Sequence, residues 1–355
     1  MNYFQRDSKT AYEAKSEAQR IAFAPVVFQA CRLLRKYDLL EPVHRSGNTG
    51  LTLNEIVAGA SVPHYGVKVL VEAGLGIGVF CLNDGRFTLT KLGYFILRDA
   101  MTHANMDMAH DICYRGLFHL DAAIEQGRPA GLQTLGDWKT FYEGLSSLPA
   151  QARESWLDFD HYYSDQAFPA ALPLVFADYP KRLLDVGGNT GKWAIQCAKH
   201  DPQVRITIAD LPRQLELARA NIREHGLEDR VDFFALDILD ETQALPEGHD
   251  VIWMSQFLDC FSEQQIVSIL RRAVRALSAD AALHILELFW DRQPNETAAF
   301  CLQQTSLYFT AIANGNSQMY QSSDMLRALA ESGLRVVAER DQVGQFHTWL
   351  KCRKA

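Results

Sequence analysis

The sequence predicts an α/β protein in which a doubly wound, mostly parallel sheet follows a mainly helical N-terminal region. From Arg182 onward, short apolar runs alternate with segments of helical spacing, as strands alternate with helices. Before that residue, apolar residues recur mostly at helical spacing. At 355 residues the chain exceeds one ordinary domain. We therefore expect a first domain at 1–100, a helical linker at 101–176 and the sheet domain at 177–355.

The first domain has the pattern of a winged helix. Three helices are expected, at 21–40, 51–60 and 67–73, with Thr52 and Ser61 near two of the starts. A hairpin is expected at 78–89, around Asn83-Asp84-Gly85. The only basic residues in or just before the third helix are His64 and Lys68, which favours dimerisation over DNA reading.

The remaining elements follow in order. The linker at 101–176 is rich in aromatic residues and is expected to be helical. Five apolar strands are predicted at 182–186, 206–209, 231–236, 250–254 and 282–288. A helix at 322–332 and two strands near 335–340 and 346–352 complete the chain. The last two strands predict an antiparallel hairpin at the sheet edge.

The stretch Leu183-Leu-Asp-Val-Gly-Gly-Asn-Thr-Gly191 predicts a ligand-binding turn between a strand and a helix. Asp210 ends the next apolar run, at the position where a nucleoside ribose meets a carboxylate. Asp185 leads the loop, and its charge would repel a dinucleotide pyrophosphate but attract a sulfonium or an ammonium. The loop therefore favours a cationic nucleoside.

The motifs Asp185-Val-Gly-Gly-Asn-Thr-Gly191 and Asp210-Leu-Pro212, with the later Asp237, resemble those of the class I, S-adenosylmethionine-dependent small-molecule O-methyltransferases. The resemblance implies a Rossmann-like seven-stranded cofactor domain behind a winged-helix-like dimerisation domain, and hence a homodimer. Asn189 stands where the family usually has a third glycine, and asparagine tolerates left-handed backbone angles.

The same resemblance assigns cofactor contacts. Asp210 would hold the ribose hydroxyls, Asp237 and Ile238 would border the adenine, and Gly187 would lie against the methionine end. The other expected cofactor residues lie in the same loops: Asp185, Gly188, Gly191, Leu211, Ser255, Gln256 and Phe261. Asp237 alone is equally well explained as a cap at a strand end.

The segment Met254-Ser-Gln-Phe-Leu-Asp-Cys-Phe-Ser262 resembles the family's catalytic region, where a histidine serves as general base. Asp259 stands in place of that histidine. Of the two glutamates that orient the histidine in the family, Glu287 matches the first, and the second falls near Ser317. The base and one of its partners are thus both replaced.

Three interpretations of this replacement remain open. Asp259 is itself the base, if burial beside Glu287 raises its pKa; or His161 is the base; or the acceptor is a phenol-activated carbon, a nitrogen or a sulfur. The family places the linker over the acceptor, and the expected pocket residues are Trp138, Tyr162, Tyr163, Phe309, Asn314, Met319 and Tyr320.

The chain is also similar to bacterial homologues of aryl-polyene pathways, whose hydroxyphenyl groups carry a ring methyl.

Composition limits the other functions. The net charge of −8 disfavours nucleic acid, no stretch is apolar enough to span a bilayer, and we expect a cytoplasmic protein. The seven cysteines form no Cys-x-x-Cys pair and no metal spacing is present, so no metal is expected. The acceptor is expected to be a small aromatic, free or carrier-linked. The alternatives are a nucleotide-dependent oxidoreductase and a non-catalytic or regulatory protein of the same fold.

Overall fold

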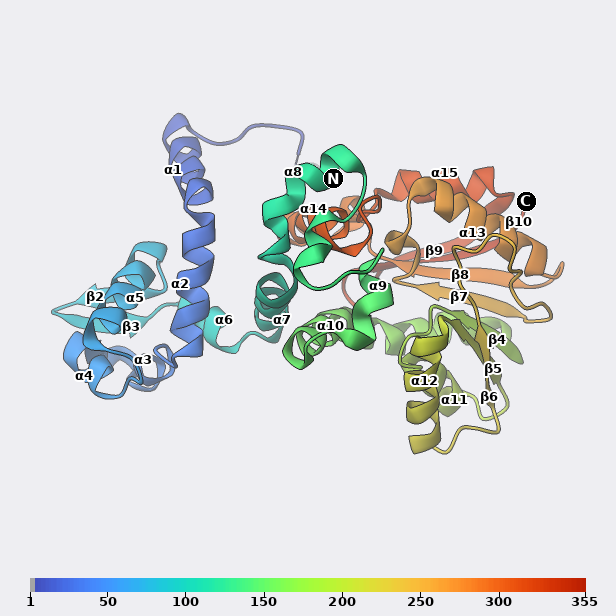
Figure 1. Ribbon diagram of the computed structural model, residues 1–355, viewed down its shortest axis with the longest axis horizontal. Helices are drawn as coiled ribbons and strands as arrows, with labels where there is room; N and C mark the ends of the chain where they lie inside the picture. Colours follow the sequence, from blue (N-terminus) through green and yellow to red (C-terminus); the bar gives the residue numbers. More distant parts are fainter. Residues whose placement is uncertain (1–3) are drawn as a thin grey trace. The chain divides into compact units, whose positions relative to one another are not determined.

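The computed structural model describes residues 4–355 (Figure 1). The chain divides into two compact units, one ending at Asp107 and the other running from Met108 to Ala355. Each unit has its own buried apolar cluster.

The N-terminal unit is mainly helical, with one small sheet. Its helices are α1 (Ala11–Ala22), α2 (Ala24–Lys36), α3 (Glu41–Arg45), α4 (Leu53–Ala58), α5 (His64–Ile77), α6 (Lys91–Arg98) and most of α7 (Ala100–Met108). Strands β1 (Leu51–Thr52), β2 (Phe80–Asn83) and β3 (Arg86–Leu89) pair in the order β1-β3-β2. This helix and hairpin order is the one expected for a winged helix.

One local expectation for this unit is corrected. The single helix expected at 21–40 is two helices, because Phe23 ends α1 and Pro25, which lacks an N–H, begins the first turn of α2. Ser61 lies near the start of α5, as expected, with Pro63 at the N-cap position. Thr52 does cap α4, and it forms a capping box with Glu55.

The hairpin turn forms where the sequence predicts it. Asp84 and Gly85 both have positive φ, 48° and 73°, the two left-handed residues that a type I′ turn requires. Asn83 pairs with Arg86 across this turn.

The C-terminal unit is built on one seven-stranded sheet. The strands are β4 (Arg182–Val186), β5 (Arg205–Asp210), β6 (Val231–Ala235), β7 (Val251–Ser255), β8 (Ala282–Glu287), β9 (Leu334–Val343) and β10 (His347–Lys354). Their order is β6-β5-β4-β7-β8-β10-β9. The first five in this order are parallel, and β10 is antiparallel to both β8 and β9. The doubly wound sheet and its terminal hairpin are confirmed.

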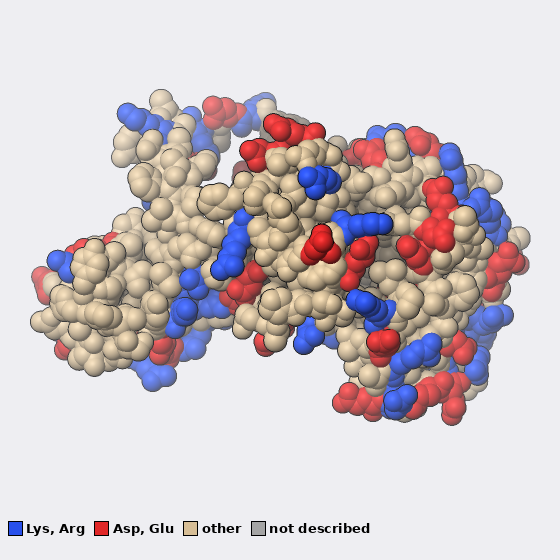
Figure 2. All heavy atoms as spheres, viewed as in Figure 1, with Lys and Arg blue, Asp and Glu red and all other residues tan. Residues whose placement is uncertain are grey.

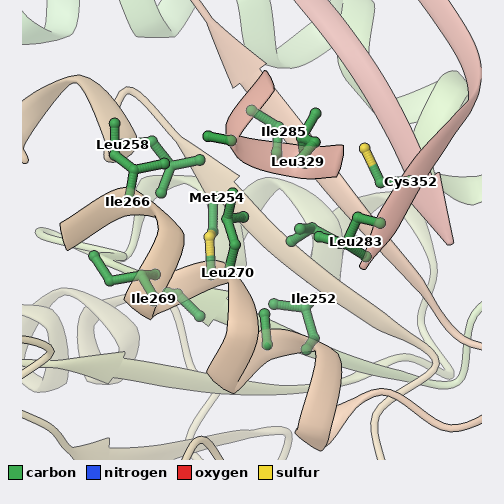
Figure 3. Close-up of a cluster of buried hydrophobic side chains, with 14 of the residues drawn as sticks. Ile252, Met254, Leu258, Ile266, Ile269, Leu270, Leu283, Ile285, Leu329 and Cys352 are labelled. Atoms are coloured by element: carbon green, nitrogen blue, oxygen red, sulfur yellow. The ribbon is translucent and has the colours of Figure 1, made fainter. Parts of the chain in front are cut away.

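Helices cover both faces of this sheet. Helices α13 (Glu263–Ala276) and α15 (Ser322–Glu331) lie on one face and bury an aliphatic cluster that includes Met254, Leu270 and Ile285 (Figure 3). Helices α10 (Ala150–Val175), α11 (Lys192–His200) and α12 (Pro212–Glu224) contribute to the cluster on the other face. There Trp193 stacks on Trp253 with ring centroids 4.1 Å apart. The packing fixes the strand ends that carry the site.

The segment before the sheet is helical, as expected. It contains α8 (Leu120–Gln126), α9 (Phe141–Gly144) and α10, and it packs with α14 (Glu296–Tyr308) in a third cluster. Two π-turns occur in this region, Ala109–Cys113 and Phe309–Ala313, and they contact each other. Such turns often mark functional sites.

Candidate active site

A cavity of about 350 Å³ lies in the C-terminal unit, at the carboxyl ends of the parallel strands. Open α/β sheets bind ligands at this edge. Its wall includes Asp185, Asp210, Asp237, Ser255 and Asp259, which follow or end four different strands. Residues of α9, α10 and α14 close the other side. The volume is within the range of small-molecule sites.

The glycine loop has little room for side chains. The Gly187 N–H donates to the Ala209 carbonyl at 2.8 Å, and a Cβ at Gly187 would overlap the Phe257 ring. A Cβ at Gly188 would lie 2.7 Å from Asp185 Oδ2. Gly191, with φ 78°, caps α11 and does not line the cavity. The loop backbone therefore forms the cavity wall directly.

Asp210 is held by the backbone. The Asn189 N–H donates to Asp210 Oδ2 at 2.8 Å, and the Leu211 N–H donates to Oδ1 at 2.7 Å. Asn189 has φ 48°, so asparagine does adopt the left-handed angle expected of a glycine here. Both carboxylate oxygens are oriented and keep lone pairs for ligand hydroxyls.

Asp185 is buried at the end of β4, with 2% of its surface exposed. Burial, and then the charge of Asp210, raises the pKa of Asp185 to about 8. Its Oδ2 is buried and has no hydrogen-bond partner among the described residues. A cationic ligand would stabilise the ionised form of this carboxyl.

The other expected cofactor residues also meet at this cavity. Asp237, Ile238, Leu211, Ser255, Gln256 and Phe261 all line it. Gln256 has φ 46°, an unusual angle for glutamine, and its Oε1 lies 3.1 Å from Nε2 of the buried His347. This contact holds Gln256 at the end of β7.

Asp259 faces the same cavity from the 3-10 turn Leu258–Cys260 and is 5% exposed. Burial raises the pKa of Asp259 to about 6. The Cys260 thiol donates a hydrogen bond to Asp259 Oδ1 at 3.4 Å. The residue at the position of the missing histidine is thus an acid whose pKa lies nearer to neutral pH.

Glu287 supports this turn and does not line the cavity. Its Oε1 accepts hydrogen bonds from the Phe257 and Leu258 N–H groups at 2.9 and 2.8 Å. Burial, and then the charge of Asp259, raises the pKa of Glu287. In this structure Glu287 orients the backbone of the turn.

A further carboxyl of the cavity wall, Asp160, was missed by the sequence analysis. Asp160 lies on α10, next to the expected His161. Burial, and then the charge of Asp259, raises the pKa of Asp160 to about 7. His161 also lines the cavity, and burial lowers its pKa. The available signal was an acid within the aromatic run Phe159–Tyr163.

The expected acceptor wall divides into two groups. Phe309, Asn314 and Met319 line the cavity. The other four lie elsewhere: Trp138, Tyr162, Tyr163 and Tyr320. Trp138 fills the space against Gly136 and Gly144, and the Tyr320 hydroxyl donates to the Phe261 carbonyl at 2.6 Å inside the core.

Two tyrosines that the sequence analysis did not select do line the cavity, Tyr142 and Tyr308. The Tyr142 hydroxyl donates to the Cys260 sulfur at 3.0 Å, and the Tyr308 hydroxyl accepts from Trp156 Nε1 at 3.3 Å. Asn314 donates to the Cys260 carbonyl at 2.6 Å and to Ser317 at 2.8 Å. Ser317, at the position of the second family glutamate, therefore serves the loop and not a base.

The surface of this unit in the view of Figure 2 carries acidic and basic side chains interspersed. No group of three or more potential metal ligands occurs within residues 4–355. None of the described helices is long and apolar enough to cross a membrane.

The donor set fits S-adenosylmethionine. Asp210 presents two oriented oxygens, as a ribose diol requires, and the partnerless Asp185 oxygen matches the cationic charge of this cofactor. Fold and site together define a class I methyltransferase.

Two family models match parts of the chain. A Dimerisation2-like domain matches residues 15–87, and an O-methyltransferase domain matches residues 174–333. Residues 174–333 therefore belong to the O-methyltransferase domain family, and residues 15–87 to the Dimerisation2-like domain family.

Two relatives differ in their named chemistry. The L-tyrosine C(3)-methyltransferase of Streptomyces lavendulae is 23% identical, over 88% of this chain and 85% of its own. The aclacinomycin 10-hydroxylase of Streptomyces purpurascens is 31% identical, over 54% of this chain and 47% of its own.

Solved structures share the fold. The apo methyltransferase SibL has a TM-score of 0.72 at 24% identity, with 96% of this chain and 99% of that chain covered. The O-methyltransferase NcsB1, solved with S-adenosylmethionine and a naphthoic acid, has a TM-score of 0.68 at 20% identity, with 94% and 96% covered.

Proposed function

We propose that this protein is an S-adenosylmethionine-dependent methyltransferase that acts on a small hydroxylated aromatic. The observation that carries the proposal is a single cavity that joins the Asp185 and Asp210 carboxyls with Asp259 and an aromatic wall. The first two suit the cofactor, and the raised pKa of Asp259 supports its role as acceptor of a phenolic proton. The aromatic wall suits an aryl acceptor.

When bound, the cofactor supplies a methyl group on a positively charged sulfur. The chain's residues place the acceptor against it and exclude water, which supplies much of the rate in such transfers. A phenol has a pKa near 10, and a carboxylate with a pKa of about 6 or 7 accepts its proton more readily than an ordinary aspartate.

We propose a ring carbon beside the hydroxyl as the methylated atom, with the hydroxyl oxygen as the alternative. The named activity of the L-tyrosine C(3)-methyltransferase, similar along most of this chain, supports this choice. Replacement of the family's histidine by Asp259 also supports it, since the expected base for oxygen transfer is absent.

We further propose that the acceptor carries no free carboxylate, as in an ester, amide or carrier-linked thioester. The described residues that line the cavity include six carboxyls: Glu143, Asp160, Asp185, Asp210, Asp237 and Asp259. Of the potential cations in the wall, Lys192 pairs with Asp165 at 2.7 Å, and burial lowers the pKa of His161. A buried acceptor carboxylate would therefore lack a cationic partner.

Ligand binding tests the cofactor assignment. S-adenosylhomocysteine at about 100 times its Kd should stabilise the fold by about 2.7 kcal/mol, while NAD should cause no shift in Tm. The reverse pattern would support an oxidoreductase. Incubation with methyl-labelled cofactor and hydroxybenzoyl or hydroxycinnamoyl esters, followed by NMR, then identifies the methylated atom.

A non-catalytic role is the second candidate, because the family's base is absent. The similarity to a protein named as a hydroxylase shows that relatives are not all named as methyltransferases. Stabilisation by S-adenosylhomocysteine without methyl transfer to any phenol in the panel would favour a binding role over the enzyme.

We propose that the protein forms a homodimer through its N-terminal unit. Large apolar side chains are exposed there, including Tyr12, Ile21, Phe23, Tyr65 and Phe95, and the unit contains the dimerisation-domain match. Light scattering should give twice the chain mass of 40.0 kDa.

A further inference from the structure

Asp160 and Asp259 reach one cavity from elements far apart in the sequence. Asp160 comes from α10 and Asp259 from the turn after β7, and both side chains are part of the cavity wall. Burial, and then the charge of Asp259, raises the pKa of Asp160 to about 7. The two groups are thus close enough to interact electrostatically.

Other groups around the two acids offset their charge only in part. Asp160 is influenced by Lys192 and Asp165, and Lys192 is paired with Asp165. Asp259 faces the Cys260 thiol and lies beside Glu287, while Tyr142, Tyr308 and Tyr320 are the other titratable groups nearby. Of the carboxyls named in this paragraph, Asp165 and Glu287 lie outside the cavity. Asp160 and Asp259 line it.

The amide of Asn189 connects the first acid to the cofactor loop. Asn189 Nδ2 donates to Asp160 Oδ2 at 3.4 Å, while its backbone N–H donates to Asp210 Oδ2 at 2.8 Å. A glycine at this position would keep the second bond and lose the first. Asn189 therefore contacts both the ribose carboxylate and an acid of the acceptor side.

We propose that Asp160 and Asp259 act together as the proton acceptor that stands in place of the family's histidine, and that Asn189 is a positioning residue for Asp160. This inference rests on the proposed function, and it adds to that proposal a second acid and a link to the cofactor loop. It also assigns two departures from the family pattern, Asn189 and Asp259, to the same proton acceptor.

The proton balance is consistent with methylation at carbon. One carboxylate accepts the phenolic O–H proton, the ring carbon forms its bond to the methyl group, and the methyl–sulfur bond breaks. The ring C–H proton then passes to the second carboxylate, and the phenolic oxygen regains its proton. One proton is released to water for each methyl group transferred. Methylation at oxygen would need only the first of these proton transfers.

Activity measurements test the pair directly. Asp160→Asn and Asp259→Asn should each lower kcat about 100-fold or more, and the double variant should lose little more than either single variant. Binding of S-adenosylhomocysteine should change less than threefold. Glu154→Gln is the control, since Glu154 is exposed on the same helix and does not line the cavity, and it should keep at least half of the kcat. Full kcat in Asp160→Asn would overturn the proposal.

Asn189→Gly tests the positioning role. The variant should bind S-adenosylhomocysteine normally, because the backbone bond to Asp210 remains, and its kcat should fall about tenfold with an altered pH profile. Asn189→Ala should show the same loss. An unchanged kcat and pH profile in both variants would contradict the role of Asn189.

A second readout does not require turnover. NMR titration of carboxyl-labelled aspartates should show that Asp259→Asn lowers the pKa of Asp160, because the like charge is removed. An unchanged pKa would refute the pair even if no acceptor had been found. If the wild type transferred no methyl group to any acceptor while Asp259→Asn still lowered the pKa of Asp160, the proposed function would be refuted and the pair would not.

Discussion

The Tyr142 hydroxyl donates a 3.0 Å hydrogen bond to the sulfur of Cys260, 118 residues further along the chain. The Cys260 thiol in turn donates to Asp259. This chain of donors ends on the carboxyl at the position of the family's histidine, so α9 contributes to the environment of the proposed base.

Tyr142→Phe should weaken catalysis without loss of the fold. The ring remains to fill the wall, but the thiol loses its donor and the cavity loses one hydroxyl. We expect kcat/KM to fall about five- to tenfold, with a Tm change of about 4 °C or less. Tyr162→Phe, outside the cavity, is the control, and an equal loss there would indicate a general effect of removing a tyrosine hydroxyl.

Asp210→Asn should impair cofactor binding selectively. The change removes the charge of the carboxylate that two backbone N–H groups orient, and it replaces one acceptor with a donor. Calorimetry should show that the Kd for S-adenosylhomocysteine rises at least tenfold. Asp232→Asn, at an exposed position on β6, should leave the Kd unchanged. Equal affinities for all three proteins would remove Asp210 from the cofactor site.

Gly188→Ala should be destabilising and should reduce cofactor binding. Its Cβ would lie 2.7 Å from Asp185 Oδ2 and 2.8 Å from Ile208 Cγ2, so the loop or the carboxyl must move. We expect a loss of about 1–3 kcal/mol in the free energy of unfolding. Gly76→Ala, within α5 and with nothing within 4 Å, should instead stabilise by about 0.5–1 kcal/mol. Denaturant titration distinguishes the two.

Stability should fall between about pH 6.5 and pH 8. In this window the unfolded chain has released the protons of Asp160 and Asp185, whose pKa values are raised in the folded state to about 7 and about 8 from 3.8. The folded state therefore binds more protons than the unfolded state, and rising pH favours unfolding.

Below this window the histidines oppose the acids. Burial lowers the pKa of His284 and His347 to about 3, so protonation of the unfolded chain favours unfolding as the pH falls below 6.5. Asp185→Asn should flatten the loss above pH 6.5 in denaturant titrations. A slope equal to that of the wild type would show that Asp185 is ionised throughout.

Acceptors without a carboxylate should be preferred. We expect methyl esters of hydroxyaryl acids to have a kcat/KM at least tenfold higher than that of the free acids. The described residues of the cavity wall include six carboxyls, and Lys192 is already paired with Asp165. Competition assays with equal concentrations of the two forms measure the ratio directly. Preference for the free acid, or for an arylalkylamine, would contradict the proposed substrate class.

The sheet was predictable because its strands are apolar runs bounded by turn residues, and Asp210 was predictable because it ends one of them. The position of Asp160 was not predictable in this way. Its helix has no clear apolar face to indicate which residues point inward, and its neighbour His161 carries the more familiar chemistry. Tyr320 was predicted to line the pocket, but it lies in the core. Its hydroxyl donates there to a backbone carbonyl, so burial leaves no polar group unpaired.

The two π-turns limit how the acceptor side can change in length. Phe309–Ala313 lies directly before Asn314, and it contacts the turn at Ala109–Cys113. Deleting one residue from the later turn would restore regular α-helical winding and rotate everything beyond it by about 100°. Asn314 would then leave the Cys260 carbonyl, so the acceptor site can be redesigned by exchanging side chains but not by shortening this helix.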